Sequence, residues 1–225
     1  MRYVLTGKPD YALAELFLDQ GESVIAESGA MVAMTGNMKI ETKARGGILS
    51  GLKRMIAGES FFTNSFHPEG GAGNIKFAPA SPGDVDALEL KGQTYFMQAG
   101  SYMAHVGDIE IDTKYGGLKS MFAGEGLFWL KISGTGTVFF NSYGGLKKVS
   151  IDGSYIVDTT HIVAFDANIQ YTVQPVGGLK ATFLSGEGLV CRYSGQGDLW
   201  IQTRSAPAFA GWLHPFRRVE QKKNE

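Results

Sequence analysis

The chain repeats one short segment three times. The copies are Gly51–Phe62 (GLKRMIAGESFF), Gly117–Phe128 (GLKSMFAGEGLF) and Gly178–Val190 (GLKATFLSGEGLV). Their central glutamates lie 66 and 62 residues apart, at Glu59, Glu125 and Glu187. A fixed period constrains a fold strongly, because each copy adopts the same supersecondary unit and buries its apolar face against its neighbours.

The similarity extends on both sides of these segments. Upstream, Ser28–Met34 parallels Ala99–His105 and, more loosely, Asp158–Ala164. Downstream, every copy reaches a Gly-x-Gly, at residues 71–73, 134–136 and 195–197. Because about 60 residues make a marginal independent core, we predict one domain over residues 1–205, built from three repeats at about 22–80, 90–145 and 150–205.

Strand patterns dominate each copy. Ile169–Gln174 alternates apolar and polar residues, which is the signature of a half-buried strand. Aromatic and β-branched runs such as Phe128–Ile132 are closed by glycines, and these Gly-x-Gly elements predict turns. Tyr11–Gln20 is compatible with a short helix, but a strand fits it better. The predicted fold is therefore all-β, a pseudo-threefold triplication of β-sandwich or β-roll units.

The last twenty residues differ from the repeats. Residues 206–216 are bounded by Pro207 and Pro215 and predict one or two helical turns, and residues 217–225 are charged and expected to fray. The tail contains the apolar run Phe209–Phe216. We expect this run to pack on the body of the protein, with docking on a neighbouring subunit or a membrane surface as the alternatives.

Charge and cysteine content limit the binding partners and the cellular compartment that we expect for this protein. The chain has 21 Lys+Arg against 22 Asp+Glu, so no global field favours nucleic acid or anionic membrane. Cys191 is the only cysteine, which excludes an internal disulfide framework. Residues 1–10 lack the apolar stretch of a signal peptide, and no run approaches the 18 residues of a transmembrane helix. We expect a cytoplasmic protein without a transmembrane segment, for which peripheral membrane association remains open.

Several of these segments together resemble a known family. They are the AGES, AGEG and SGEG copies, the block Glu27–Val32 (ESGAMV) and the closing Leu199–Ser205 (LWIQTRS). Over roughly residues 3–206 the chain resembles the altered-inheritance-of-mitochondria protein 24 family. The resemblance implies a fold like that of the tryptophan RNA-binding attenuator, built as a triplication and often assembled into homo-oligomers such as trimers. It implies no catalytic residues, and the mitochondrial relatives are linked to inner-membrane organisation.

The repeated glutamates are candidate ligand-binding residues. If the threefold is real, Glu59, Glu125 and Glu187 occupy equivalent places, and a ring of carboxylates would suit calcium or magnesium. Such a ring needs an ion or protons, because close carboxylates repel one another. The simpler interpretation is that each carboxylate accepts hydrogen bonds from its own glycine turn. We favour this interpretation and predict no resident metal or cofactor.

A cation also recurs after each glycine turn. Lys53, Lys119 and Lys180 could form a ring for a phosphate or an anionic polymer, with aromatic residues nearby for stacking. A solvated turn with exposed lysines explains them equally simply and is favoured. The attenuator-like fold does not by itself predict RNA binding, because fold does not fix function.

No familiar catalytic constellation stands in the sequence. His67, His105, His161 and His214 are widely spaced and lack zinc-site spacing. Met31, Tyr102 and His161 fall at one repeat position, which is typical of packing, and Cys191 has no identifiable base. The leading hypothesis is a non-enzymatic, homo-oligomeric scaffold or interaction module. The alternative is a module that binds a small molecule, an anion or RNA at the repeat junctions.

Overall fold

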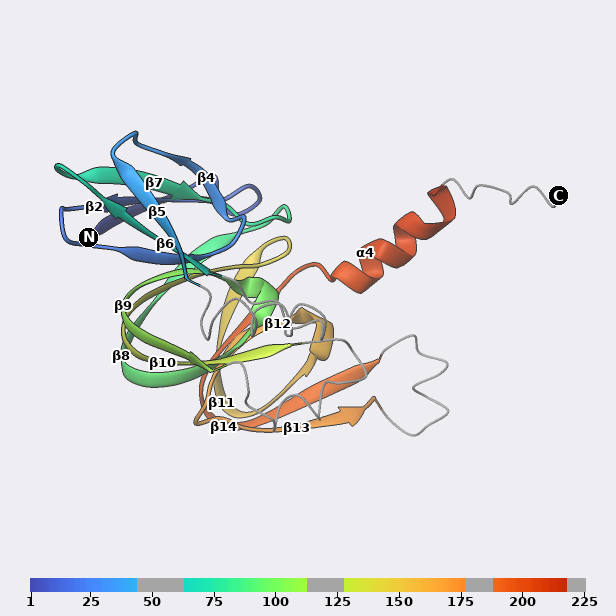
Figure 1. Cartoon of the computed structure of the whole chain (residues 1–225). Coiled ribbons are helices and arrows are strands. Elements are labelled where there is room, and N and C mark those ends of the chain that lie inside the picture. Colours follow the sequence, from blue (N-terminus) through green and yellow to red (C-terminus); the bar gives the residue numbers. More distant parts are fainter. Residues whose placement is uncertain (44–62, 113–127, 177–187, 218–225) are drawn as a thin grey trace.

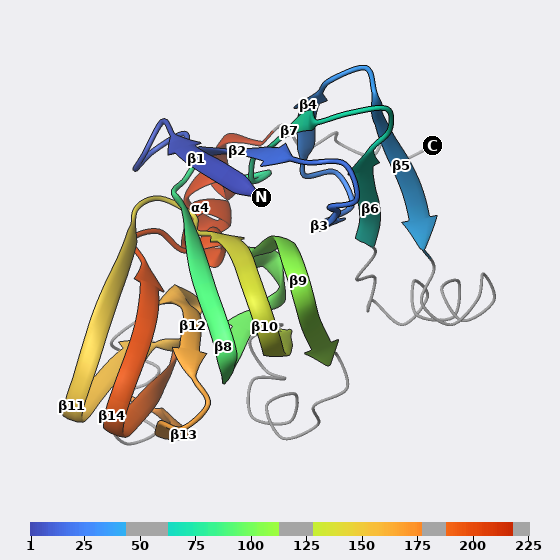
Figure 2. The ribbon, with the colours of Figure 1, turned by 90° about the vertical axis from the view of Figure 1, so that its left-hand side faces the viewer.

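The computed structural model describes residues 1–43, 63–112, 128–176 and 188–217. Its strands form a four-stranded sheet and a ten-stranded sheet (Figures 1 and 2). The first consists of β1 (Arg2–Thr6), β2 (Leu13–Leu18), β7 (Gly73–Phe77) and β4 (Met31–Met34), in that spatial order. Every pairing between these named strands is antiparallel. The strand predicted within Tyr11–Gln20 is therefore confirmed as β2.

The ten-stranded sheet contains the remaining described strands. Its spatial order is β11 (Leu146–Asp158), β14 (Leu189–Gln202), β12 (Ile162–Asp166), β8 (Val85–Gln98), β10 (Trp129–Asn141), β9 (Tyr102–Asp112), β3 (Val24–Glu27), β6 (Thr63–Pro68) and β5 (Met38–Lys43), and β13 (Gln170–Pro175) also pairs with β14. Short 3-10 helices, Ala99–Ser101 and Thr159–His161, precede β9 and β12. The described chain is thus mostly antiparallel β-sheet, as predicted.

In the middle and C-terminal parts of the chain, the last strand lies between two earlier strands of the same part. β10 pairs with β8 on one edge and β9 on the other. β14 pairs with β11 on one edge and with β12 and β13 on the other. Near the N-terminus the same arrangement is divided between two short strands, because β7 lies between β2 and β4 while β6 lies between β3 and β5.

The prediction of turns at Gly-x-Gly is wrong for the second and third copies. Gly134 and Gly136 lie within β10, and Gly195 and Gly197 lie within β14. All four have positive φ, from +110° to +158°. Such a φ bends a strand without ending it, and the register of β10 shifts beside Gly134. A bend within a strand and a turn between strands both need glycine, because other residues rarely adopt a positive φ.

The buried residues form three apolar clusters, each of which takes side chains from more than one segment. The N-terminal cluster includes Met103 and Phe139, and the middle cluster includes Trp200. In the third cluster, Phe165 contacts aromatic side chains from four other strands, namely Phe96, Trp129, Tyr171 and Tyr193. The segments therefore complete one another's cores.

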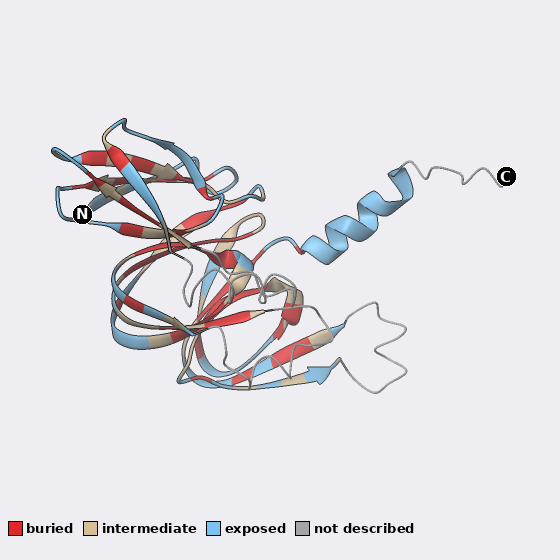
Figure 3. Cartoon of the chain, in the orientation of Figure 1, coloured by how far each residue is buried: buried red, intermediate tan, exposed pale blue. Residues whose placement is uncertain are grey.

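The predicted C-terminal helix is present as α4 (Ala206–Leu213), followed by a 3-10 turn, His214–Phe216. Ser205 begins it, because its hydroxyl accepts a hydrogen bond from the backbone N–H of Ala208 at 3.4 Å. The helix projects from the sheets and none of its residues is buried (Figures 1 and 3). The expectation that Phe209–Phe216 packs on the body is wrong, since Trp212 is 64% exposed. Phe209 does contact Tyr143 of the body, and Trp212 contacts Phe209 and Phe216 of its own segment.

Candidate functional site

The residues singled out by the repeat cannot be placed. Both triplets lie outside the described residues, namely the glutamates Glu59, Glu125 and Glu187 and the lysines Lys53, Lys119 and Lys180. The hypotheses of a carboxylate ring and of a lysine ring therefore stay predictions.

The histidines make ordinary structural contacts. His105 is buried, and its Nδ1 lies 2.7 Å from the hydroxyl of Tyr102, which also donates to the carbonyl of Ile25 at 3.2 Å. The Nδ1 of His161 lies 2.7 Å from the carbonyl oxygen of Gln202. Among the described residues, no three His, Cys, Asp or Glu side chains gather as a metal site.

The lone thiol lies deep in the third apolar cluster. Cys191 is fully buried, and this burial raises the pKa of its thiol to about 11. A thiol must ionise to act as a nucleophile. At neutral pH Cys191 therefore behaves as a small apolar core residue, as the sequence suggested.

One carboxyl group is shifted strongly. Glu27 ends β3, beside the strand pairing that joins β3 to β9, and burial raises the pKa of its carboxyl to about 7. A buried carboxyl disfavours its charged form because it loses its hydration. Glu27 therefore changes charge near neutral pH, although no sequence pattern distinguished it.

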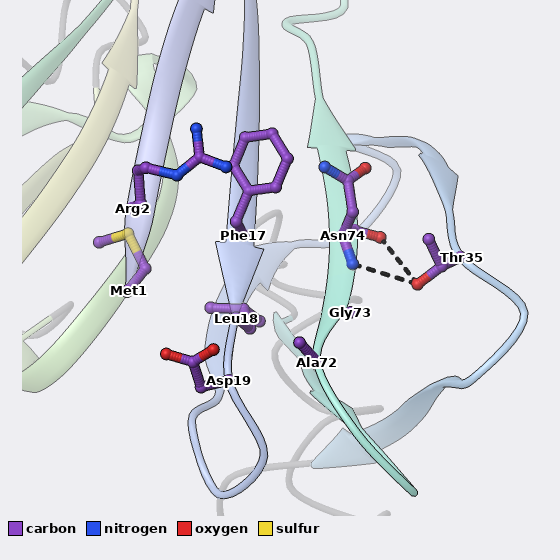
Figure 4. A pocket seen from close by; sticks show the side chains of 9 residues that line it. All are labelled: Met1, Arg2, Phe17, Leu18, Asp19, Thr35, Ala72, Gly73 and Asn74. Carbon is purple, nitrogen blue, oxygen red and sulfur yellow. Dashed lines mark hydrogen bonds between the residues drawn. The ribbon is translucent and has the colours of Figure 1, made fainter.

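The larger pocket lies on the N-terminal sheet (Figure 4). It has a volume of about 520 Å³ and is open to solvent along the ends of β1, β2 and β7. The guanidinium of Arg2 lies 3.8 Å from the centre of the Phe17 ring, and the hydroxyl of Thr35 accepts from the backbone N–H of Asn74 at 3.1 Å. The charged side chains in its lining are Arg2 and Asp19, so the pocket suits a small polar molecule more than a polyanion.

A smaller pocket of about 260 Å³ lies at the connection between the first and second segments. Residues 78–83 line it together with Tyr11 and Ala12. The backbone N–H of Ala12 donates to the carbonyl of Gly83 at 2.9 Å. In the same way, the N–H of Asp84 donates to the carbonyl of Gly144 at 3.1 Å. The start of each segment is thus tied to the start of the next.

Two of the described sheet edges each expose more than one large apolar side chain. β4 is the last strand of its sheet, and Met31, Val32 and Met34 are 39%, 55% and 37% exposed. β11 ends the other sheet, and Tyr155 and Ile156 near its end are 39% and 49% exposed. A signal for the first edge was present, because Met31–Met34 is a run of four apolar residues, which is typical of a strand covered on both faces.

Bent antiparallel strands with shared apolar cores, exposed apolar edges and a projecting C-terminal helix place the described chain in the class of mostly antiparallel β proteins. No helix in the described ranges is long and apolar enough to cross a bilayer. The model of one family, described as mitochondrial biogenesis AIM24, matches residues 3–204. The chain belongs to this family, which confirms the resemblance seen in its sequence.

Two bacterial relatives are similar over nearly the whole chain. An uncharacterised protein of Streptococcus pyogenes serotype M6 is 32% identical over 223 residues, which cover 95% of this chain and 90% of the relative. A crystal structure of a Streptococcus pyogenes protein superposes with a TM-score of 0.78 at 31% identity, covering 96% of this chain and 99% of the other. Neither description states an activity.

Proposed function

We propose that the protein is a non-enzymatic, homo-oligomeric scaffold made of three repeated β units. The observation that carries this proposal is the exposure of apolar side chains at two sheet edges and along α4. Large apolar side chains gathered on a surface mark sites of contact with other molecules. Unpaired strand edges do the same, because their free N–H and C=O groups accept a further strand.

The strand pairings support the repeated architecture. Each unit consists of a first strand, a second strand and a last strand that pairs with both: β8, β9 and β10 in the middle unit, and β11, β12 with β13, and β14 in the last. In the N-terminal unit the three are split, into β2 with β3, β4 with β5, and β6 with β7. This recurring arrangement supports the proposed triplication.

The 3-10 helices refine the alignment of the units. They make Ile162 of the last unit equivalent to Tyr102 of the middle unit, because each residue is the first of its strand after the helix. The sequence alignment put His161 there, one residue early. With this correction, Ala104 corresponds to Ala164 and His105 to Phe165. In the first unit, by the original alignment, the same two positions belong to Ala33 and Met34.

The helix α4 supplies a second contact surface. Phe209, Trp212 and Leu213 are 47%, 64% and 47% exposed, and Phe209 contacts Tyr143 at a ring-centre distance of 6.0 Å. Helices that lie on membranes carry basic residues on a polar face, whereas residues 206–213 (APAFAGWL) have no charge. We therefore propose that α4 docks on protein, with a neighbouring protomer as the first candidate.

Native mass spectrometry of the full-length protein tests the assembly. A trimer or a multiple of three chains, at multiples of the 24.3 kDa chain mass, supports the scaffold. A monomer at micromolar concentration would refute it. A variant with Trp212→Ser separates the two contact surfaces, because loss of assembly in this variant would make α4 the main contact.

A small-molecule module remains the second candidate, and the Figure 4 pocket is the observation that favours it. In the same spectrum, a mass excess retained by the native protein and lost on denaturation would support ligand binding. A matched variant, Asn74→Leu, keeps the strand and removes the polar wall of the pocket. Equal retention of the extra mass by this variant would place the ligand elsewhere.

A further inference from the structure

Resting on the proposed homo-oligomer, we propose that chains join head to tail by strand pairing, with β4 of one copy added to the exposed edge of β11 in the next. In this pairing Met34 lies opposite Ile156 and Ala33 lies opposite Val157. The partner is therefore a second copy of this chain.

The chain itself contains the template for this junction twice. Between the first and middle units, β3 pairs with β9, with Ile25 opposite His105 and Ala26 opposite Ala104. Between the middle and last units, β8 pairs with β12, with Phe96 opposite Phe165 and Met97 opposite Ala164. In both junctions, the end of one unit's first strand pairs with the start of the following unit's second strand.

The two junctions share one register. Glu27, Gln98 and Asp158 are the last residues of the three first strands. Counting back from them makes Ile25, Phe96 and Ile156 equivalent, and Ala26, Met97 and Val157 equivalent. Counting in the same way along the second strands, Met34 corresponds to His105 and Phe165. In the same register, a third junction would pair Ile156 with Met34. Met34 belongs to the first unit and Ile156 belongs to the last.

The described part of the chain leaves these two edges unmatched. β4 pairs with β7, and no other described strand pairs with it. β11 pairs with β14, and no other described strand pairs with it. The two strands lie far apart in both views of the ribbon (Figures 1 and 2). A single chain therefore does not close the third junction on itself.

The exposed fraction of the side chains differs between the two internal junctions and the two free edges. Within the chain, His105, Phe165 and Phe96 are 2%, 0% and 5% exposed. At the equivalent positions of the free edges, Met34 is 37% exposed and Ile156 is 49% exposed. Pairing β4 with β11 would bring Met34 toward the burial of His105 and Phe165, and Ile156 toward that of the half-buried Ile25 and the buried Phe96.

The charges on the edge strands point the same way. β5 also ends a sheet, and it carries the exposed charged residues Lys39 and Glu41, which is how proteins protect an edge from further pairing. β4 reads MVAM and has no such protection. On β11 the lysines stand at the start, Lys147 and Lys148, whereas the proposed contact falls on the apolar end, Tyr155–Val157.

Such a junction is heterologous, because it joins two different surfaces. Heterologous contacts build closed rings when the rotation between copies closes, and filaments when it does not. Head-to-tail pairing therefore makes a distinctive prediction: the β4 edge of one chain contacts the β11 edge of another, and neither edge contacts itself.

Disulfide cross-linking of full-length protein tests this arrangement. One protein carries Met34→Cys and a second carries Ile156→Cys. After the two are mixed, unfolded and refolded together to exchange subunits, and then oxidised, covalent dimers are expected in the mixture and in neither protein alone. The double variant should give a ladder of covalent oligomers up to the native subunit number. The native Cys191 is buried and does not interfere.

A register control uses Met34→Cys with Tyr155→Cys. Residue 155 lies one position away and faces the other side of the strand, so its cross-linking yield should fall at least fivefold. Self-cross-linking of either single variant, or equal yields in the two registers, overturns the proposal. If native mass spectrometry shows an oligomer that does not cross-link at 34 and 156, the junction is wrong and the scaffold stands. If the wild-type protein is a monomer, both fail.

Discussion

Gly134 and Gly195 offer a matched test of why the long strands bend. They occupy the same repeat position and have nearly equal φ values, +117° and +110°. A Cβ on Gly134 would lie well under 3.0 Å from the carbonyl oxygen of Asp108 on β9, whereas a Cβ on Gly195 would meet nothing within 4 Å. The two positions therefore share the backbone strain of a substitution and differ in the steric overlap.

The structure sets the size of each effect. An alanine at such a φ costs about 1–2 kcal/mol of the free energy of unfolding, which is the loss we expect for Gly195→Ala. Gly134→Ala adds overlap with the backbone of a paired strand, and this costs a further 1–3 kcal/mol, roughly as overpacking does. Any reduction in the entropy of the unfolded chain is the same for both variants and cancels in their difference.

Urea unfolding followed by tryptophan fluorescence and circular dichroism measures the difference. With a slope of about 2–3 kcal/mol/M, the midpoint for Gly134→Ala should lie roughly 0.3–1.5 M below that for Gly195→Ala. Equal midpoints would mean that the strain of positive φ is the whole effect and that β9 and β10 tolerate separation beside Gly134. The argument from close approach of the two strands would then be refuted.

Three further predictions follow from burial and charge. Because the pKa of Glu27 is raised to about 7, its stabilising contribution is present below about pH 4.5 and lost as pH rises through 7. Glu27→Gln should therefore stabilise the protein by about 1–2 kcal/mol at pH 8, after allowing for partial exposure, and by almost nothing at pH 4.5, as thermal melts at both pH values will test. Cys191 should resist labelling by a thiol reagent at pH 8 in the native protein and react in urea; equal rates would contradict its burial. Ile156→Lys should raise the dissociation constant of the oligomer at least tenfold in sedimentation velocity, while Ile40→Lys, at an equally exposed position (49%) on the protected edge, should change it less than twofold.

The strand content and the terminal helix could be predicted because they depend on local pattern. Period 2 identified the strands, and Pro207 and Pro215 bracketed the helix. The position of the Gly-x-Gly elements within strands could not be predicted, because a turn and a bend within one strand both require a positive φ at positions such as Gly134. The position of α4 depends on whether the body offers an apolar surface, which no local pattern records.

The candidate site shows a different limit. Repetition in the sequence drew attention to residues that are alike in all copies, such as Glu125 and Lys119. The edge residues Met34 and Ile156 belong to repeated positions too, but what distinguishes them is that no described strand pairs with the outer edges of β4 and β11. That property depends on whether a unit is the first or the last in the chain, and an alignment of the units does not record this position.

Counting junctions shows why a chain of this kind is expected to assemble. Three units joined in sequence, as proposed, would make two internal junctions and leave one first-strand edge and one second-strand edge without a partner. In the proposed alignment, Met34 and Ile156 occupy the positions of the buried Phe165 and Phe96. Exposed apolar edges favour association. Each head-to-tail pairing would satisfy one edge of each chain, and closure into a ring would leave no edge free.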